Sequence, residues 1–454
     1  MEKYLSRSID QALLEWKDNP RRKPLLVRGA RQVGKSSTIR HLGKNFKYFL
    51  EVNVERNPEV MEFFKGSRDV KSIAAKLSDF FNVPVVPGET LLFLDEIQKC
   101  EDVIHSLWFF KEDYPELHVI AAGSLLEFAL KNLSSFGVGR VSSLFVYPMS
   151  FDEFLTATRQ EGLLRIKRNS SPTNPLPEAF YNRLVEAFRS YMLVGGMPEA
   201  VATYTETGSY RYSSDIVNEI IQGYQDDFAK YGAKANPLLL RQTLISVAHQ
   251  AGAKFVCSRV EGQYRSAEVK VALEMLKDAG LIIPTYHTDA NGVPLGAEIN
   301  ERVVKYLIHD TGVLLGILGI DDDIDERIKE MMVADSIDLV DKGHVAEMMA
   351  GLELIKYSSP QTRHQLYYWQ NMNKGTCAEV DYVIARSGSI VPIEVKSGVK
   401  GSMSSMYSLM RNPQKHIEMG IRCSLENFGT FASPDGKKID IIPLYAISNL
   451  FAEK

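Results

Sequence analysis

The sequence predicts an α/β fold: a parallel sheet covered by helices, then a helical region, then a second unit that mixes helix and strand. Three observations support this prediction. Between residues 25 and 147, short apolar runs alternate with segments of helical periodicity, which is typical of parallel strands buried on both faces. From residue 178 to residue 231 the apolar positions recur at helical spacing. From about residue 335 one long helical pattern gives way to several short strand-like runs and a further helix.

The first sheet is expected to contain five strands. They span residues 25–27, 48–54, 90–94, 118–122 and 143–147, and an amphipathic helix within residues 1–20 precedes them. Ligands of parallel sheets bind at the carboxyl ends of the strands. Asp95, Glu96 and Ser124 directly follow the third and fourth strands, so we expect these side chains at the ligand-binding edge.

The remainder of the chain contains a connection, a helical stretch and two further regions. Residues 156–176 are polar and indicate a loose connection, and a turn at 195–198 interrupts the helical stretch. Helices at 237–250 and 266–279, followed by a short strand at 281–283 and a turn at 289–292, suggest a winged-helix unit. The predicted domains are residues 1–155, 156–235, 236–334 and 335–454.

Composition limits the class of protein. A chain of 454 residues with 45% hydrophobic residues can form about three globular domains. Its net charge of −4 gives no general attraction to nucleic acid. The four cysteines form no C-x-x-C pair, which favours a reducing compartment and argues against a cysteine zinc site. With no signal-like or membrane-spanning apolar run, we expect a cytoplasmic protein that has no membrane partner.

One stretch organises the first domain. Residues 29–36 fit the phosphate-binding pattern G-x-x-x-x-G-K-[ST] between a strand and a helix. Its backbone N–H groups would cradle phosphate oxygens, Lys35 would reach the β- and γ-phosphates, and the Ser36 hydroxyl would ligate Mg²⁺. The predicted cofactors are therefore ATP and Mg²⁺. The predicted nucleotide-binding residues of this stretch are Gly29, Ala30, Arg31, Gln32, Val33, Gly34, Lys35, Ser36 and Ser37.

Four further residues are expected to complete an ATPase site. Asp95 would hold Mg²⁺ and Glu96 would polarise the attacking water. Ser124 has two interpretations of equal weight: a sensor of the γ-phosphate, or a helix N-cap whose capping box includes Glu127. Arg140 is either a charge-stabilising arginine or an ordinary surface arginine.

A second group of charged residues lies near the C-terminus. If residues 380–384 and 390–396 form a hairpin centred between Ser387 and Gly388, Asp381 lies opposite Glu394 and Glu379 lies opposite Lys396. All four side chains then share one face of the hairpin, and the apolar side chains share the other.

Two carboxylates opposite each other destabilise a hairpin unless something neutralises them. A bound Mg²⁺ or Mn²⁺ held by Asp381 and Glu394 is one explanation. Glu347, on a preceding helix, would add a ligand, and Lys396 would stabilise charge on a phosphodiester, as in a nuclease. The other explanation is a solvated hairpin face on which Lys396 softens the repulsion.

The expected winged-helix region shows weak evidence for DNA binding. Residues 236–290 carry six basic and five acidic side chains, whereas DNA-binding modules usually have a clearly basic face. This balance favours packing or protein contact. His309 and Asp310 form an isolated pair without a nucleophile, which indicates a structural role.

The motifs together resemble those of a group of prokaryotic AAA-type (AAA+ superfamily) ATPases that carry a C-terminal domain of unknown function. The similar stretches are residues 29–36, 91–98, 122–124, 139–140, 147–151, 193–199, 305–312, 379–384 and 392–398. The resemblance spans nearly the whole chain and implies an AAA-like core, a winged-helix region and a C-terminal domain akin to PD-(D/E)XK nucleases. It also implies a homo-oligomer, because many AAA-type proteins complete their site with a neighbour's arginine. Ser36 replaces the usual threonine and keeps the hydroxyl.

Two functions follow from these patterns. The first is an ATP-hydrolysing AAA-type protein whose nucleotide state controls a nuclease-like C-terminal domain, with DNA as the candidate substrate. Its ATPase residues are Lys35, Ser36, Asp95 and Glu96, and its second site comprises Glu347, Asp381, Glu394 and Lys396. The alternative is a nucleotide-dependent switch that binds a protein partner and whose C-terminal domain is a catalytically inactive interaction module.

Overall fold

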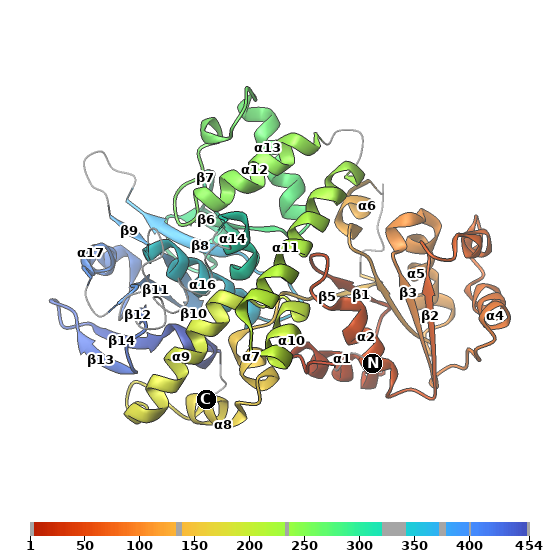
Figure 1. Ribbon diagram of the computed structural model, residues 1–454, viewed down its shortest axis with the longest axis horizontal. Coiled ribbons are helices and arrows are strands. Elements are labelled where there is room, and N and C mark those ends of the chain that lie inside the picture. The colour runs from red at the N-terminus through yellow and green to blue at the C-terminus, as the bar shows by residue number, and fades with distance from the viewer. Residues whose placement is uncertain are drawn as a thin grey trace.

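A five-stranded parallel sheet forms the first part of the computed structural model (Figure 1), which describes residues 4–132, 139–231, 236–319, 342–371, 378–398 and 401–451. The strand order is β2-β3-β4-β1-β5. The strands are β1 (Leu25–Arg28), β2 (Tyr48–Asn53), β3 (Thr90–Asp95), β4 (His118–Ala122) and β5 (Ser142–Phe145). The five predicted strands are confirmed, because each observed end lies within two residues of the expected one.

Helices cover both faces of this sheet. They are α1 (Ile9–Asp18), α2 (Lys35–Gly43), α3 (Met61–Phe64), α4 (Val70–Phe81), α5 (Glu101–Asp113) and α6 (Leu126–Asn132). Successive residues of β3 point to opposite faces, as the strand geometry requires. Leu91 and Phe93 pack in one core with α1 and α2, whereas Leu92 and Leu94 pack in another with α4 and α5.

A group of helices follows the sheet. It comprises α7 (Phe151–Ala157), α8 (Glu161–Arg168), α9 (Glu178–Val194), α10 (Pro198–Thr207) and α11 (Tyr210–Asp227). The expectation of a loose connection at 156–176 is wrong over α8. Its sequence reads as polar, but Lys167 is fully buried and pairs with Asp152, so a charged residue lies on the inner face of this helix.

The next region contains the expected pair of helices, followed by two antiparallel strands. These are α12 (Pro237–His249), α13 (Ser266–Asp278), β6 (Ile282–Thr288) and β7 (Ile299–Ile308), and α14 (Thr311–Ile317) follows. The strand predicted at 281–283 is longer than expected, because β6 pairs on both sides. It is antiparallel to β7 and parallel to β8 (Leu366–Gln370), which in turn pairs with β9 (Glu379–Val380).

The second α/β unit has a mixed sheet of order β10-β11-β12-β14-β13. Its elements are α16 (Lys342–Lys356), β10 (Tyr382–Arg386), β11 (Ser389–Val395), α17 (Ser404–Arg411), β12 (Met419–Ser424), β13 (Gly429–Ala432) and β14 (Lys438–Pro443). Val391 and Ile393 share a core with α16, whereas Ile390 shares another with α17, so helices lie on both faces. The predicted α/β fold class is confirmed. The boundary expected at residue 334 lies outside the described residues.

Within the described part of the chain, no helix combines the length and apolar character needed to cross a membrane.

Candidate nucleotide site and a second carboxylate cluster

The phosphate-binding loop borders a cavity of about 630 Å³ at the carboxyl ends of the first sheet's strands. The predicted residues that line it are Arg31, Gln32, Gly34, Lys35, Ser36, Ser37, Asp95, Glu96 and Ser124. Gly29, Ala30 and Val33 were also predicted to bind the nucleotide but are not among the described residues that line this cavity. Gly29 has a φ of +147°, and a Cβ there would lie only 2.1 Å from the Val146 carbonyl oxygen. Any side chain at this position would therefore push the loop away from β5.

Lys35 is buried at the base of this cavity. Its Nζ donates to the carbonyl oxygens of Gly29 at 2.9 Å and Ala30 at 2.6 Å. Burial lowers the pKa of Lys35 to about 8, although the nearby carboxylates of Glu96 and Asp95 oppose that shift. Two carbonyl groups thus hold the amine where the loop turns inward.

A continuous chain of hydrogen bonds runs along the cavity wall. Ser36 Oγ donates to Asp95 Oδ2 at 3.1 Å, and the Glu96 backbone N–H donates to Asp95 Oδ1 at 3.0 Å. The Glu96 carboxylate accepts from Ser124 Oγ at 3.2 Å and from Gln98 Nε2 at 2.5 Å. Burial raises the pKa of Asp95, and Glu96 adds to that rise. The structure therefore brings together three strand-end residues and the loop serine.

The capping interpretation of Ser124 is wrong. Helix α6 begins at Leu126, and the Glu127 carboxylate binds the Arg28 guanidinium at 2.6 Å instead of closing a capping box. Ser124 is consequently free to hold Glu96. Sequence alone left the two roles equal because the partner of Glu127 lies 99 residues earlier.

Arg140 does not lie at the nucleotide cavity of this chain. Its Nε donates to Glu112 at 2.7 Å, and its guanidinium stacks 4.0 Å above the Trp108 ring. Arg140 is not among the described residues that line the cavity. The prediction that it belongs to this chain's own nucleotide site is therefore wrong.

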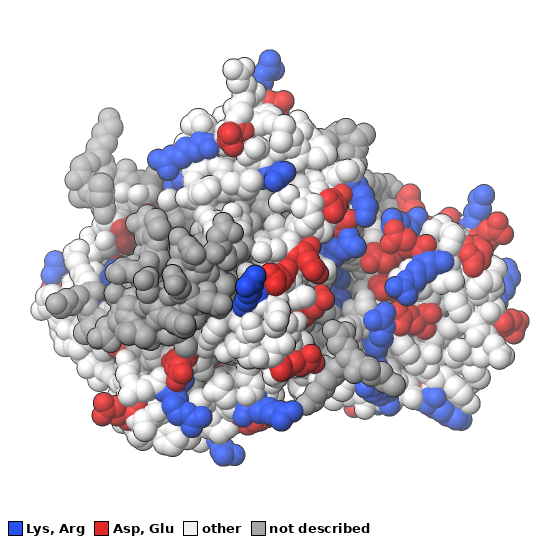
Figure 2. Space-filling view, viewed as in Figure 1, with Lys and Arg blue, Asp and Glu red and all other residues white. Residues whose placement is uncertain are grey.

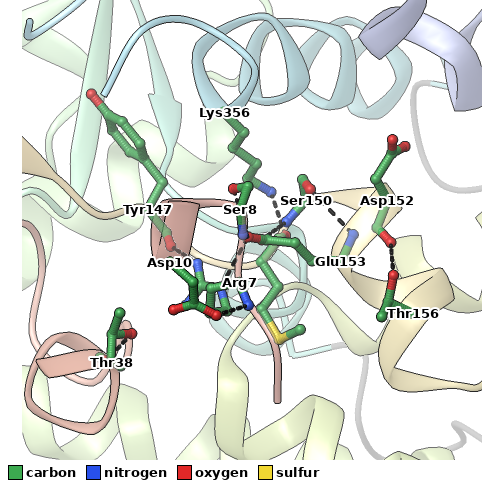
Figure 3. A network of polar contacts seen from close by, with 12 residues as sticks. Arg7, Ser8, Asp10, Thr38, Tyr147, Ser150, Asp152, Glu153, Thr156 and Lys356 are labelled. Carbon is green, nitrogen blue, oxygen red and sulfur yellow. Dashed lines mark hydrogen bonds and ion pairs between the residues drawn. The ribbon is translucent and has the colours of Figure 1, made fainter. Parts of the chain in front are cut away.

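The N-terminal segment supplies residues that the sequence did not reveal. Arg7 Nη1 donates to the loop carbonyl of Val33 at 3.0 Å, and Nη2 donates to the Tyr147 carbonyl at 2.7 Å. Figure 3 shows Arg7 between Tyr147 and Glu153, and Arg7 Nε lies 3.2 Å from Glu153 Oε1. Both charged side chains are more than 90% buried. Tyr4 also lines the cavity. A single arginine ahead of a helix carries no local signal for this role.

Helix α11 holds the loop from another side. The Arg31 guanidinium pairs with Asp227, and Tyr224 Oη donates to the Arg31 carbonyl at 3.1 Å. Tyr224 also lies 3.2 Å from His309 Nε2. Asp310 caps α14 and accepts from the Gly196 backbone N–H at 2.6 Å, which confirms the structural role expected for the His309–Asp310 pair.

Three parts of the chain match the models of known families. Residues 21–155 match the model of a family described as an AAA domain. This part of the chain is thus similar to AAA-type P-loop domains. Residues 185–324 and 342–447 match two families that are both described as domains of unknown function (DUF8612 and DUF4143).

Comparison with individual proteins adds little. The search of curated proteins gave no match. One similar solved structure is that of the Aeropyrum pernix Orc1 protein in complex with DNA, at 13% sequence identity and a TM-score of 0.29. The match covers 72% of this chain and 95% of that chain. A likeness at this score supports no conclusion about the arrangement or function of the present protein.

The C-terminal hairpin forms with the expected turn but not over its expected length. Arg386 pairs with Ser389, which leaves Ser387 and Gly388 as the two-residue loop. In that register Asp381 falls opposite Glu394, and its carboxylate accepts from the Val395 backbone N–H at 2.7 Å.

The predicted pairing of Glu379 with Lys396 is wrong. Glu379 belongs to β9 and pairs with Gln370 of β8. The Lys396 backbone N–H donates to the carbonyl of Cys423 at 2.7 Å. The chain changes sheets at Asp381, a bend that the alternation of side chains does not reveal.

The charged side chains nevertheless gather around one point. Lys396 Nζ donates to Glu394 Oε1 at 2.6 Å. Burial raises the pKa of Glu347 to about 8 and that of Glu394 to about 7, and Asp381 adds to both shifts. Burial also raises the pKa of Asp381. Glu347 and Glu394 are both buried, and the hairpin register sets Asp381 opposite Glu394, so the predicted carboxylates form one largely dry cluster.

Lys305 is the member of this cluster that sequence analysis missed. It comes from β7, and its Nζ donates to Glu347 Oε1 at 2.8 Å and to Glu379 Oε1 at 2.5 Å. Burial opposes its charge, but the two glutamates outweigh that effect and raise the pKa of Lys305. Its stretch, residues 305–312, contributed to the family resemblance, yet nothing local distinguished its lysine.

On the face shown in Figure 2, the charge distribution agrees with the balance expected from the sequence. Basic and acidic side chains are interspersed on the face shown in Figure 2, including the part above α12 and α13. Within α13, Lys277 pairs with Glu274. The winged-helix assignment and a DNA-binding role for this region remain predictions.

Proposed function

We propose that the protein binds ATP with Mg²⁺ and hydrolyses the triphosphate. The observation that carries this proposal is the hydrogen-bonded series Ser36, Asp95, Glu96 and Ser124 along the wall of the P-loop cavity. It brings a hydroxyl, a carboxylate that could bind Mg²⁺ and a second carboxylate to the carboxyl edge of the sheet, where nucleotides bind to parallel sheets. The match to an AAA domain supports the same chemistry.

The chain's own residues fit a magnesium ion. Ser36 Oγ and Asp95 Oδ2 lie 3.1 Å apart, and oxygen ligands of this kind suit a hard cation. When bound, Mg²⁺ would be held by Ser36 and Asp95 and would neutralise charge on the phosphates.

Glu96 is the residue that we assign to the attacking water. Ser124 and Gln98 both donate to its carboxylate and so fix its direction toward the cavity. A carboxylate held in this way orients a water molecule and accepts its proton as the bond to phosphorus forms. Lys35 and the loop N–H groups bind the phosphate oxygens and stabilise the charge that develops there.

The test is phosphate release together with ATP binding. Glu96→Gln should retain ATP affinity and lose roughly 10²- to 10⁴-fold in hydrolysis rate, the usual contribution of a general base. Lys35→Ala should lose ATP binding itself. Glu89→Gln is the matched control, because Glu89 is half-exposed and pairs with Lys47 away from the cavity. Hydrolysis that survives Glu96→Gln at the wild-type rate would rule out the assigned role.

We further infer that nucleotide state controls the C-terminal region, because two elements of the carboxylate cluster also reach the P-loop. Helix α16 carries Glu347, and its later residue Glu353 accepts from the Phe151 backbone N–H at 3.1 Å. Phe151 begins α7, whose cap is tied through Glu153 to Arg7. These contacts form one continuous polar connection to the loop.

The second connection follows β7. This strand carries Lys305 and is followed directly by His309, which lies against Tyr224 and so against the Arg31 carbonyl of the loop. A shift of the P-loop when phosphate binds would therefore move both α16 and β7, which carry charged residues of the cluster.

The output of that control has two candidates. The first is a nuclease-like site that acts on DNA; the second is a catalytically inactive domain that binds a protein partner. Balanced surface charge around α12 and α13 favours the second. Metal-dependent DNA cleavage, measured with and without ATP for the wild type, Asp381→Ala and Lys35→Ala, separates them. Absence of cleavage with intact ATP turnover selects the partner-binding switch.

The resemblance to AAA-type ATPases also supports a homo-oligomer in which a neighbour contributes an arginine. Arg140, which lies outside its own chain's cavity, is one such candidate.

A further inference from the structure

The cluster formed by Glu347, Glu379, Asp381 and Glu394 has the residue types of a divalent-metal site. In a metal site the carboxylate oxygens must point toward one position, and no other cation may occupy that position. Among the described residues, no three His, Cys, Asp or Glu side chains are arranged to hold a metal ion. The residue types fit a metal, but their arrangement does not.

Lys305 accounts for this disagreement. Its side chain is 1% exposed, and its Nζ lies 2.8 Å from Glu347 Oε1 and 2.5 Å from Glu379 Oε1. The Tyr368 ring closes the other side, with its centroid 4.9 Å from the same nitrogen. The amine is therefore enclosed by carboxylates and an aromatic face, the surroundings that a buried cation requires.

The other oxygens of the cluster are only partly engaged. Asp381 Oδ2 accepts from the Val395 backbone N–H, and Glu394 Oε1 accepts from Lys396. Glu394 Oε2 is buried and has no hydrogen-bond partner. Glu394 therefore keeps a buried carboxylate oxygen that a second cation could bind, but the Lys305 amine already holds Glu347.

Two cations cannot share these carboxylates without strong repulsion. A divalent ion bound to Glu347 would lie within a few ångströms of the Lys305 amine, in surroundings of low dielectric constant where like charges repel strongly. Either the metal or the lysine can neutralise the cluster, and the Lys305 amine contacts both Glu347 and Glu379.

We propose that Lys305 is the resident cation of this cluster: its ammonium group holds Glu347 and Glu379 in place of a divalent metal, and no such metal binds while the lysine remains there. The proposal does not depend on ATP hydrolysis. It makes Lys305 the residue that decides whether the C-terminal site can become a metal site at all.

The test is a titration of the full-length, nucleotide-free protein with Mn²⁺, with unbound Mn²⁺ measured by electron paramagnetic resonance. All proteins carry Asp95→Asn, which removes the other predicted metal carboxylate. The otherwise unchanged chain should bind no Mn²⁺ at the cluster. Lys305→Met should gain roughly one ion per chain, because it frees carboxylate ligands of the kind that hard cations bind.

Three further proteins make the result specific. Lys305→Arg keeps the charge and should gain no site, and Lys305→Met combined with Asp381→Asn should lose the gained site. Lys415→Met is the matched control, because Lys415 is also a buried lysine but donates to Asp289 and Asn291 outside the cluster.

Two outcomes would overturn the proposal. One is Mn²⁺ binding by the protein that retains Lys305, if Asp381→Asn abolishes it; this arm does not require any Lys305 variant to fold. The other is a folded Lys305→Met protein that gains no ion. If Lys305→Met does not fold, Lys305→Gln takes its place, because glutamine removes the charge and can still donate to Glu347.

Discussion

In the P-loop cavity, burial affects the protonation of individual side chains. Lys35 is the clearest case, because its amine is enclosed by the loop and held by two carbonyl oxygens. Carbonyl groups bind an ammonium but carry no full charge, so they compensate the lost hydration only in part. Phosphate oxygens would supply the missing negative charge. The affinity for ATP should therefore depend on whether Lys35 is protonated.

This dependence gives the first prediction. Burial lowers the pKa of free Lys35 to about 8, and bound phosphate would raise it. The contribution of Lys35 to binding is then complete below pH 8 and is lost as pH rises toward the pKa of the complex. ATP affinity, measured by calorimetry, should fall by up to about tenfold per pH unit above pH 8, with uptake of a proton. Lys35→Arg should remove this slope; an equal slope in that variant would contradict the prediction.

At the scale of elements, motifs that are far apart in sequence meet at the start of α7. The Met149 backbone N–H donates to the Gly196 carbonyl at 2.6 Å, and the Gly196 N–H donates to Asp310. The Phe151 N–H donates to Glu353 of α16. Three of the stretches that carry the family resemblance thus form one junction. This junction packs the helices together and fixes the backbone where α7 begins.

The second prediction concerns the tight packing of this junction. A Cβ at Gly196 would lie 2.2 Å from the Met149 carbonyl oxygen, a backbone atom that cannot move independently. Gly196→Ala should therefore destabilise the protein by about 1–3 kcal/mol, the usual cost of overpacking. Gly162→Ala in α8 is the matched control, because a Cβ there has no neighbour within 4 Å.

Denaturant unfolding of the two variants checks this prediction. Gly162→Ala should be neutral or stabilising by roughly 0.5–1 kcal/mol, since alanine favours a helix interior over glycine. Equal midpoints for the two variants would show that the close approach at Gly196 carries no energetic cost.

At the scale of the whole molecule, the AAA-type domain and the C-terminal unit are joined by buried polar contacts as well as by the chain. Lys356 Nζ donates to the Met149 carbonyl at 3.1 Å and to Tyr191 Oη at 2.6 Å, and Tyr191 Oη donates to Glu353 at 2.7 Å. Figure 3 shows Lys356 near Ser150, the residue that follows Met149. A buried network of this kind favours a fixed relation between the C-terminal end of α16 and the start of α7, because breaking one contact leaves its partner unpaired.

The third prediction follows from this arrangement. ATP added to Glu96→Gln, which should bind without turnover, is expected to change amide hydrogen exchange in α2, and also in α16 and β7. Lys35→Ala should abolish all of these changes. Adding Arg7→Ala to Glu96→Gln should weaken the change in α16, because it removes the link from Val33 to Glu153.

The same hydrogen-exchange measurement distinguishes the connection to α16 from the connection to β7. Residues of β7 should still respond in the Arg7→Ala protein, because their contact runs through Tyr224 and His309. A response confined to α2 in every protein would contradict nucleotide control of the C-terminal region.

Local patterns were sufficient for much of the fold and for the predicted core of the nucleotide site. The parallel strands, the phosphate loop, Asp95 and Glu96 are encoded by short runs of residues, because strand burial and loop geometry depend on immediate neighbours. The two-residue turn at Ser387 and Gly388 was predictable for the same reason.

Only the tertiary structure decided which charges meet. Lys305 and Glu347 are 42 residues apart, and Arg7 and Glu153 are 146 apart. Neither pair leaves a periodic signal, because a buried ion pair depends on how complete elements pack and on the absence of water, not on local spacing. The sequence by itself thus determined the fold class and the phosphate loop. Packing alone brought Arg7 to the loop and placed a lysine in the C-terminal carboxylate cluster.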